Sequence, residues 1–113
     1  MAEFEEIWPD LVNHARTAEF VRPFDRGKRR ELAYDAEREA VVFENGRTDL
    51  IFRKNWRRAW EELRRNGVLS VAKFSGAAGT ARAELALPFL ADALDLPADR
   101  DSRRIQLSER YER

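Results

Sequence analysis

The sequence predicts an α+β fold, because stretches with helical spacing alternate with β-prone runs in a chain of 113 residues. Apolar side chains recur at helical spacing in several stretches, which predicts amphipathic helices. Asn45-Gly46 separates two β-prone runs, and this dipeptide is the strongest short-range hairpin signal because both residues accept positive φ. A chain of this length is long enough for one hydrophobic core, so we expect residues 1–113 to form a single domain.

The first part of this domain, residues 1–53, is expected to hold an N-terminal helix and a small antiparallel β-sheet. Residues 3–17 place six apolar side chains on one helical face, with Pro9 in the first half of the pattern. Strands are expected at 20–24, 31–36, 40–44 and 48–53. The Asn45-Gly46 signal predicts a hairpin that pairs residues 41–43 with residues 50–52.

The second part, residues 54–108, begins with a predicted helix at 56–66. Its apolar face follows the i, i+3, i+4, i+7 pattern. Asn55 is expected to cap its start, and Gly67 is expected to end it in the left-handed conformation. A short extended piece follows at 68–69.

Two more helices are expected after this piece. Ser70 is a suitable cap for a short helix at 71–74, and Thr80 for a longer helix at 80–94 in which Pro88 bends or restarts the chain. A glycine-rich turn at 75–79 separates the two. A closing hairpin is expected within 96–107, so the order of elements is that of a winged helix-turn-helix.

Within about residues 67–107 several sequence motifs also resemble those of a known family. The matching segments are Leu69-Ser70-Val71-Ala72-Lys73-Phe74, Gly79-Thr80-Ala81-Arg82, Ala86-Leu87-Pro88-Phe89-Leu90, Asp95 and Arg103-Arg104-Ile105. They resemble the C-terminal RNA-binding domain of bacterial selenocysteine-specific elongation factors. The resemblance implies a winged helix that holds an RNA hairpin. The family's basic and aromatic group before its Ala-Leu is replaced here by Arg82-Ala83-Glu84-Leu85.

Composition narrows the classes of function. The chain has 21 basic and 21 acidic side chains, so any nucleic-acid face must come from local segregation of charge. It has no cysteine, which excludes disulfides and thiolate metal sites and agrees with a reducing compartment. The N-terminus is acidic where a signal peptide would be basic, and no apolar run is long enough to span a bilayer. We therefore expect a cytoplasmic protein without a membrane partner.

Local groups of basic residues are the candidate site, with DNA or RNA as the expected partner. They lie on the helix pair, in the closing hairpin, in the turn at 26–30 and at the start of the helix at 56–66. The candidate nucleic-acid-binding residues are Arg82, Lys73, Arg100, Arg103, Arg104, Arg26, Lys28, Arg29, Arg30 and Arg57. Arginine suits this role because its planar fork binds phosphate oxygens in a bidentate way. Solvated surface charge is the alternative interpretation of each group.

A protein-interaction adaptor or inhibitor is the alternative function, because winged helices also serve protein contacts. The exposed side of the helix at 80–94 is expected to carry Arg82, Glu84, Asp92 and alanines. This composition argues against base reading by that helix and would leave room for a partner helix in a homodimer. We expect no catalytic residue, metal site or cofactor, because His14 has no partner placed by sequence and no phosphate loop or zinc pattern occurs. A metal-dependent nuclease could be built only on carboxylates. The candidate carboxylates near the predicted hairpins are Asp35, Glu37, Glu44 and Asp49.

Overall fold

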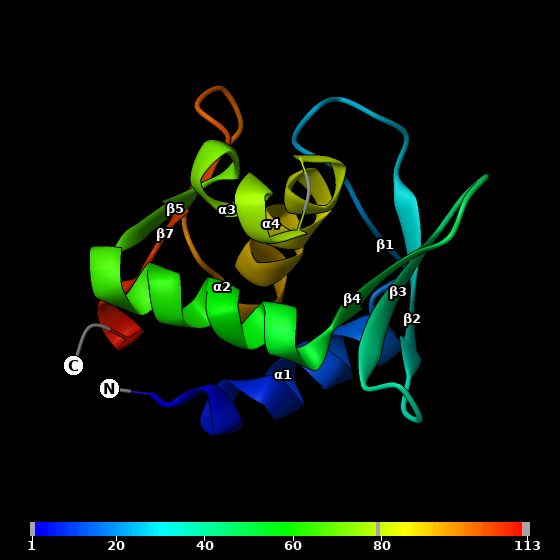
Figure 1. Cartoon of the computed structure of the whole chain (residues 1–113), viewed down its shortest axis with the longest axis horizontal. Helices are drawn as coiled ribbons and strands as arrows, with labels where there is room; N and C mark the ends of the chain where they lie inside the picture. Colours follow the sequence, from blue (N-terminus) through cyan, green and yellow to red (C-terminus); the bar gives the residue numbers. More distant parts are fainter. Residues whose placement is uncertain (1, 79, 112–113) are drawn as a thin grey trace.

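The computed structural model of the chain describes residues 2–78 and 80–111. It confirms an α+β fold with an N-terminal helix and a small antiparallel sheet. The elements are α1 (Phe4–Thr17), β1 (Phe20–Val21), β2 (Arg30–Asp35), β3 (Ala40–Glu44), β4 (Asp49–Phe52), α2 (Arg53–Asn66), β5 (Val68–Ser70), α3 (Val71–Ala78), α4 (Thr80–Leu94), β6 (Ala98–Asp99), β7 (Arg104–Gln106) and the 3-10 helix η1 (Glu109–Tyr111). In Figure 1, α4 lies between the four-stranded sheet β1–β4 and the smaller sheet that contains β5 and β7.

Helix α1 is close to its prediction. A capping box fixes its start, in which the Glu6 side chain accepts the Glu3 backbone N–H at 3.2 Å. Pro9 lies inside the helix without ending it. The predicted apolar face is the buried face, with Phe4, Ile7, Trp8, Leu11 and Ala15 in the core.

The four-stranded sheet has the order β1-β2-β3-β4. The predicted hairpin is confirmed, since Val41 pairs with Ile51 and Val42 pairs with Leu50. Its turn uses positive φ at Asn45, 117°, and at Gly46, 86°. Side chains alternate along the strands, so Val41 and Ile51 are buried while Val42 and Leu50 are half-buried on the opposite face.

Helix α2 follows β4 with no linker. It begins at Arg53, so the prediction that Asn55 caps a helix starting at Trp56 is wrong. The reason is tertiary: the Arg53 N–H donates to the Glu39 carbonyl at 2.9 Å, and the Trp56 indole N–H donates to the Ile51 carbonyl at 3.0 Å. These two bonds fix the first turn of the helix against the sheet.

The end of α2 and the start of α3 follow the sequence signals. Gly67 has φ 75° and its N–H bonds to the Leu63 carbonyl at 2.7 Å, as expected of a left-handed helix end. The Ser70 hydroxyl accepts the Lys73 N–H at 3.3 Å, which confirms the predicted cap.

The glycine-rich turn is the largest departure in this region. Helix α3 continues through residues 75–78 to Ala78, so the short helix and the loop expected there are wrong. Gly79 lies outside the described residues, as does the side chain of Thr80 with its predicted capping role. Helix α4 continues through Pro88 instead of restarting there.

The core forms around α4, in which every residue from 83 to 91 is buried. Phe89 lies at its centre, with ring centroids 5.0 Å from Trp56, 5.9 Å from Phe43 and 5.2 Å from His14. Trp8 and Trp60 are also buried, which confirms that the three tryptophans are core residues. The smaller sheet has the order β5-β7-β6, and the predicted return is confirmed by the pairing of Ala98 with Ile105. Among the helices that the structure describes, none combines the length and the apolar character needed to cross a bilayer.

Candidate nucleic-acid interface

Two of the predicted basic groups lie together in the fold. One is the loop at 22–29, which joins β1 to β2, and the other is the turn at 100–103, which joins β6 to β7. Arg100 connects them, because its guanidinium donates to the Pro23 carbonyl at 2.9 Å and to the Arg22 carbonyl at 3.4 Å. The same guanidinium lies 5.6 Å from the centroid of the Phe24 ring. Loop 22–29 and turn 100–103 therefore form one continuous surface.

Helix α4 joins this surface through Glu84. The Glu84 carbonyl accepts the Phe24 N–H from loop 22–29 at 3.1 Å, and its carboxylate accepts Arg103 Nη1 from turn 100–103 at 2.9 Å. The Glu84 side chain is only 3% exposed, whereas that of Arg103 is 51% exposed. Burial raises the pKa of Glu84, and the neighbouring Arg103 charge opposes that rise.

A cleft of about 490 Å³ lies between loop 22–29 and turn 100–103. Its lining residues are Phe24, Asp25, Arg26, Arg100, Asp101 and Arg103. Local hydrogen bonds shape both walls. The Asp25 carboxylate accepts the Gly27 N–H at 2.9 Å, and the Asp99 carboxylate accepts the N–H groups of Asp101 and Ser102. The bonds from Ser102 lower the pKa of Asp99 and keep it ionised.

Arg30 is a correction to the predicted site. It lies at the start of β2 rather than in a turn, and it is buried. Its guanidinium donates to the carbonyls of Phe43, Glu44 and Arg47 and to the Asp49 carboxylate, each at 2.9 Å. With Nε and Nη2 bonded inside the protein and its side chain only 9% exposed, Arg30 holds the β3–β4 hairpin.

The basic residues of loop 22–29, unlike Arg30, lie on the surface. Arg26 and Lys28 are exposed, and no hydrogen bond or ion pair engages either side chain within the described chain. Arg29 is exposed too, with its guanidinium 4.7 Å from the Phe20 ring centroid. Arg26 has a φ of 65°, in the left-handed region, and its side chain is exposed. These three residues keep their charges available to a ligand.

Helix α4 cannot supply the reading face that a helix-turn-helix usually offers. Glu84 was expected on its exposed side but is buried, as are Ala83 and Ala91, because α3, α1 and the four-stranded sheet pack against this helix. The alanine surface expected for a partner helix is therefore used by the chain's own core. Arg82 is exposed at the first turn of α4.

Lys73 and Arg104 complete the candidate set near this end of α4. Lys73 is exposed on α3, and Arg104 is exposed on β7, where it pairs with Ser70 in the sheet. Neither side chain has an ion-pair partner among residues 2–78 and 80–111. Both belong to the elements that surround turn 100–103.

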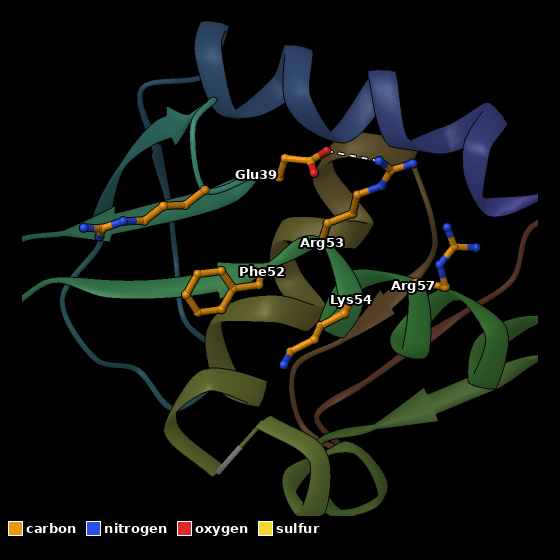
Figure 2. Close-up of a pocket in the computed structure, with 6 residues that line it drawn as sticks. Glu39, Phe52, Arg53, Lys54 and Arg57 are labelled. Atoms are coloured by element: carbon orange, nitrogen blue, oxygen red, sulfur yellow. Dashed lines mark hydrogen bonds and ion pairs between the residues drawn. The ribbon is translucent and has the colours of Figure 1, made fainter.

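The third basic group lies apart, at the start of α2. It borders a second pocket of about 540 Å³, lined by Arg38, Glu39, Phe52, Arg53, Lys54 and Arg57, none of which lines the cleft. Figure 2 shows the ion pair of Arg53 with Glu39, 3.0 Å long, and Lys54 directed away from it. Arg57 bonds to the Glu5 carboxylate at 2.6 Å and lies 4.8 Å from the Phe4 ring centroid. The Arg57 hydrogen bond lowers the pKa of Glu5. Arg57 thus holds α1 against α2.

The imagined carboxylate metal set does not assemble. Within residues 2–78 and 80–111, no group of three or more His, Cys, Asp or Glu side chains is arranged to hold a metal ion. Asp49 instead binds Arg30 and Arg47. His14 is half-buried against Phe89, and burial lowers its pKa.

No family model, curated protein or solved structure matches the chain. The candidate site therefore stands on its geometry. The sequence does not predict the role of Glu84, which is expected on the exposed side of its helix and is not among the candidate site residues. No local signal distinguishes it, since its burial depends on the elements packed around α4 and its ion-pair partner Arg103 lies 19 residues away.

Proposed function

We propose that residues 54–108 form a winged helix and that the protein is a non-catalytic nucleic-acid-binding protein. The order α2, β5, α3, α4, β6, β7 supports the first part, together with a three-stranded sheet in which β7 lies between β5 and β6. In this description α3 and α4 are the helix pair and turn 100–103 is the tip of the wing.

The binding proposal rests mainly on the contact between two basic groups, loop 22–29 and the wing, that are far apart in the sequence. Loop 22–29 holds Arg22, Arg26, Lys28 and Arg29, and the wing holds Arg100, Arg103 and Arg104. Arg100 joins the two through the Pro23 carbonyl. In a chain with no net charge, such local concentration of arginine is what phosphate binding requires.

The proposed mechanism is attraction of the phosphate backbone to loop 22–29 and the wing. Base reading in a major groove would need exposed polar side chains along α4, and residues 83–91 of that helix are buried. Arg82 on α4, Lys73 on α3 and Arg104 on β7 add exposed charge. Binding should therefore depend strongly on salt and weakly on base sequence.

Fluorescence anisotropy at two salt concentrations tests the proposal, with labelled duplex DNA, single-stranded DNA and an RNA hairpin as probes. Affinity should fall steeply with salt, and an Arg26→Ala/Lys28→Ala variant should lower the salt slope by about 2, one for each lost phosphate contact. Arg65→Ala is the matched control, because Arg65 is an exposed arginine of α2 paired with Glu62, outside this surface. Absence of binding to all three probes at low salt would refute the function.

The rival function is a protein-interaction adaptor, and one observation favours it. Val42, Leu50 and Phe52 are half-buried apolar residues on the outer face of the four-stranded sheet. They do not belong to the apolar residues packed against the core, unlike Leu32 and Tyr34 of the same sheet. Failure to bind nucleic acid, combined with a partner whose binding is lost in Leu50→Asp, would establish this alternative.

A further inference from the structure

Two arginines of the cleft are held in place by acceptors behind them. Carbonyl oxygens of loop 22–29 hold Arg100, and the Glu84 carboxylate holds Arg103. An arginine that is fixed before a ligand arrives loses less side-chain entropy on binding. The two guanidinium groups thus resemble a prepared site more than two solvated surface charges.

Glu84 has no evident purpose other than to hold Arg103. One carboxylate oxygen accepts Arg103 Nη1 at 2.9 Å, while the other, Oε2, is buried and has no hydrogen-bond partner among the described residues. A buried carboxylate costs stability unless it is paired, so an apolar residue in the middle of α4 would serve the core better. The placement is explained if the orientation of Arg103 matters.

The cleft still offers unused donors. In the part of the chain that the structure describes, no hydrogen bond uses Nε or Nη2 of Arg103, Nε of Arg100 or any donor of Arg26. Three guanidinium groups on one cavity suit a phosphomonoester, which presents three unesterified oxygens and close to two negative charges at neutral pH. A phosphodiester within a chain presents two such oxygens and one charge.

The walls of the cleft also favour the end of a strand over its interior. Asp25 and Asp101 line the cleft beside the arginines, so successive phosphates running through it would meet carboxylates. A terminal phosphate places one anionic group, instead of a series of them, among the side chains that line the cleft.

We propose that the cleft binds a phosphomonoester at the end of a nucleic-acid strand, with Arg26, Arg100 and Arg103 as ligands and Glu84 as the positioning residue of Arg103. This inference rests on the proposed nucleic-acid binding and makes it more specific. The protein then recognises a strand end through its phosphate, and loop 22–29 and the wing hold the adjoining backbone.

The test uses one oligonucleotide sequence, labelled internally, with a 5′-phosphate, a 3′-phosphate or hydroxyls at both ends. At moderate salt, one phosphorylated form should bind about tenfold more tightly than the hydroxyl form, the size expected from charge-assisted hydrogen bonds. Arg26→Ala should remove this preference, and its side chain has no internal bond whose loss would unfold the protein. Arg65→Ala should keep the preference.

Glu84 is tested by the same ratio. Glu84→Ala frees Arg103 and should remove most of the preference, while Glu84→Gln keeps an acceptor for Arg103 and should retain it. A purely structural role would change the unfolding midpoint of both variants without changing the ratio. Circular dichroism verifies that each variant is folded at the assay temperature.

The possible outcomes distinguish failure of the strand-end site from failure of the proposed nucleic-acid binding. Equal, salt-dependent binding of all three oligonucleotides would overturn the strand-end site and leave nucleic-acid binding intact, whereas no binding of any would overturn both. A preference that survives in Arg26→Ala and Glu84→Ala would move the site away from the cleft. Competition by a free mononucleotide as strong as that by the phosphorylated oligonucleotide would assign the cleft to free nucleotides and also refute strand-end binding.

Discussion

Replacing Arg30 should destabilise the protein far more than replacing a second arginine that binds the same carboxylate. Arg30 and Arg47 both bond to Asp49 Oδ2, at 2.9 and 3.1 Å, but the Arg30 side chain is 9% exposed and the Arg47 side chain is 64% exposed. Methionine at either position keeps most of the stem and removes the charge. Comparing the two methionine variants therefore shows how much burial of the arginine adds to stability when the ion-pair partner, Asp49, is the same.

The magnitude follows from the bonds that are lost. Arg30→Met removes donors from three backbone carbonyls and from Asp49. At roughly 1 kcal/mol each, reduced by water that reaches the end of the hairpin, the free energy of unfolding should fall by about 3 kcal/mol. Arg47→Met removes one exposed ion pair and should cost less than about 1 kcal/mol.

Urea unfolding followed by tryptophan fluorescence measures the difference, because Trp56 and Trp60 lie in the core beside the sheet. With an m-value of about 1.5 kcal/mol/M, the midpoint of Arg30→Met should fall by about 2 M and that of Arg47→Met by less than about 0.7 M. Similar shifts for the two variants would refute the reasoning that burial and carbonyl bonding make Arg30 structural.

Three further predictions concern single positions. Gly67→Ala should cost about 1 kcal/mol in urea unfolding, because φ of 75° is strained for any residue with a Cβ, and a cost near zero would contradict the left-handed helix end. Phe89→Ala should cost about 3–5 kcal/mol by the same measurement, since it removes the ring between Trp56 and Phe43, and a milder loss would mean that the core collapses to fill the space. Arg103→Ala should lower the free energy of unfolding more at pH 7 than at pH 4. Burial raises the folded-state pKa of Glu84 above its usual 4.5. The carboxylate left without Arg103 therefore costs stability as the pH rises through that raised pKa, and it costs little once it is protonated. Equal losses of unfolding free energy at the two pH values would exclude this linkage.

Features set by neighbouring residues could be read from the sequence. Asn45-Gly46 specified its hairpin because the turn dihedrals are a local property, and Gly67 specified a helix end for the same reason. Contacts between distant segments set the rest. Arg30 looked like turn charge because its acceptors lie 13 to 19 residues away, and the start of α2 shifted because a Glu39 carbonyl receives the Arg53 N–H.

The basic groups show the same division. The sequence identifies the basic residues. Only the folded structure shows which of them bond to other parts of the chain and which stay available to a ligand. Arg26 and Lys28 stay available, whereas Arg57 bonds to Glu5, 52 residues away. The burial of Glu84 likewise depends on sheet and helix packing around α4, which helical periodicity alone does not report.

The direct passage from β4 into α2 has a mechanical consequence. Phe52 ends the strand and Arg53 begins the helix, with the Trp56 indole bonded back to Ile51. Tension applied to the hairpin is therefore transmitted along α2 to β5 without a compliant segment that could absorb it. An insertion at this position would break that direct connection. An insertion in the β3–β4 turn, at the free end of the hairpin (Figure 1), would displace the Glu44 and Arg47 carbonyls that Arg30 holds, so a reporter or affinity tag belongs at neither position.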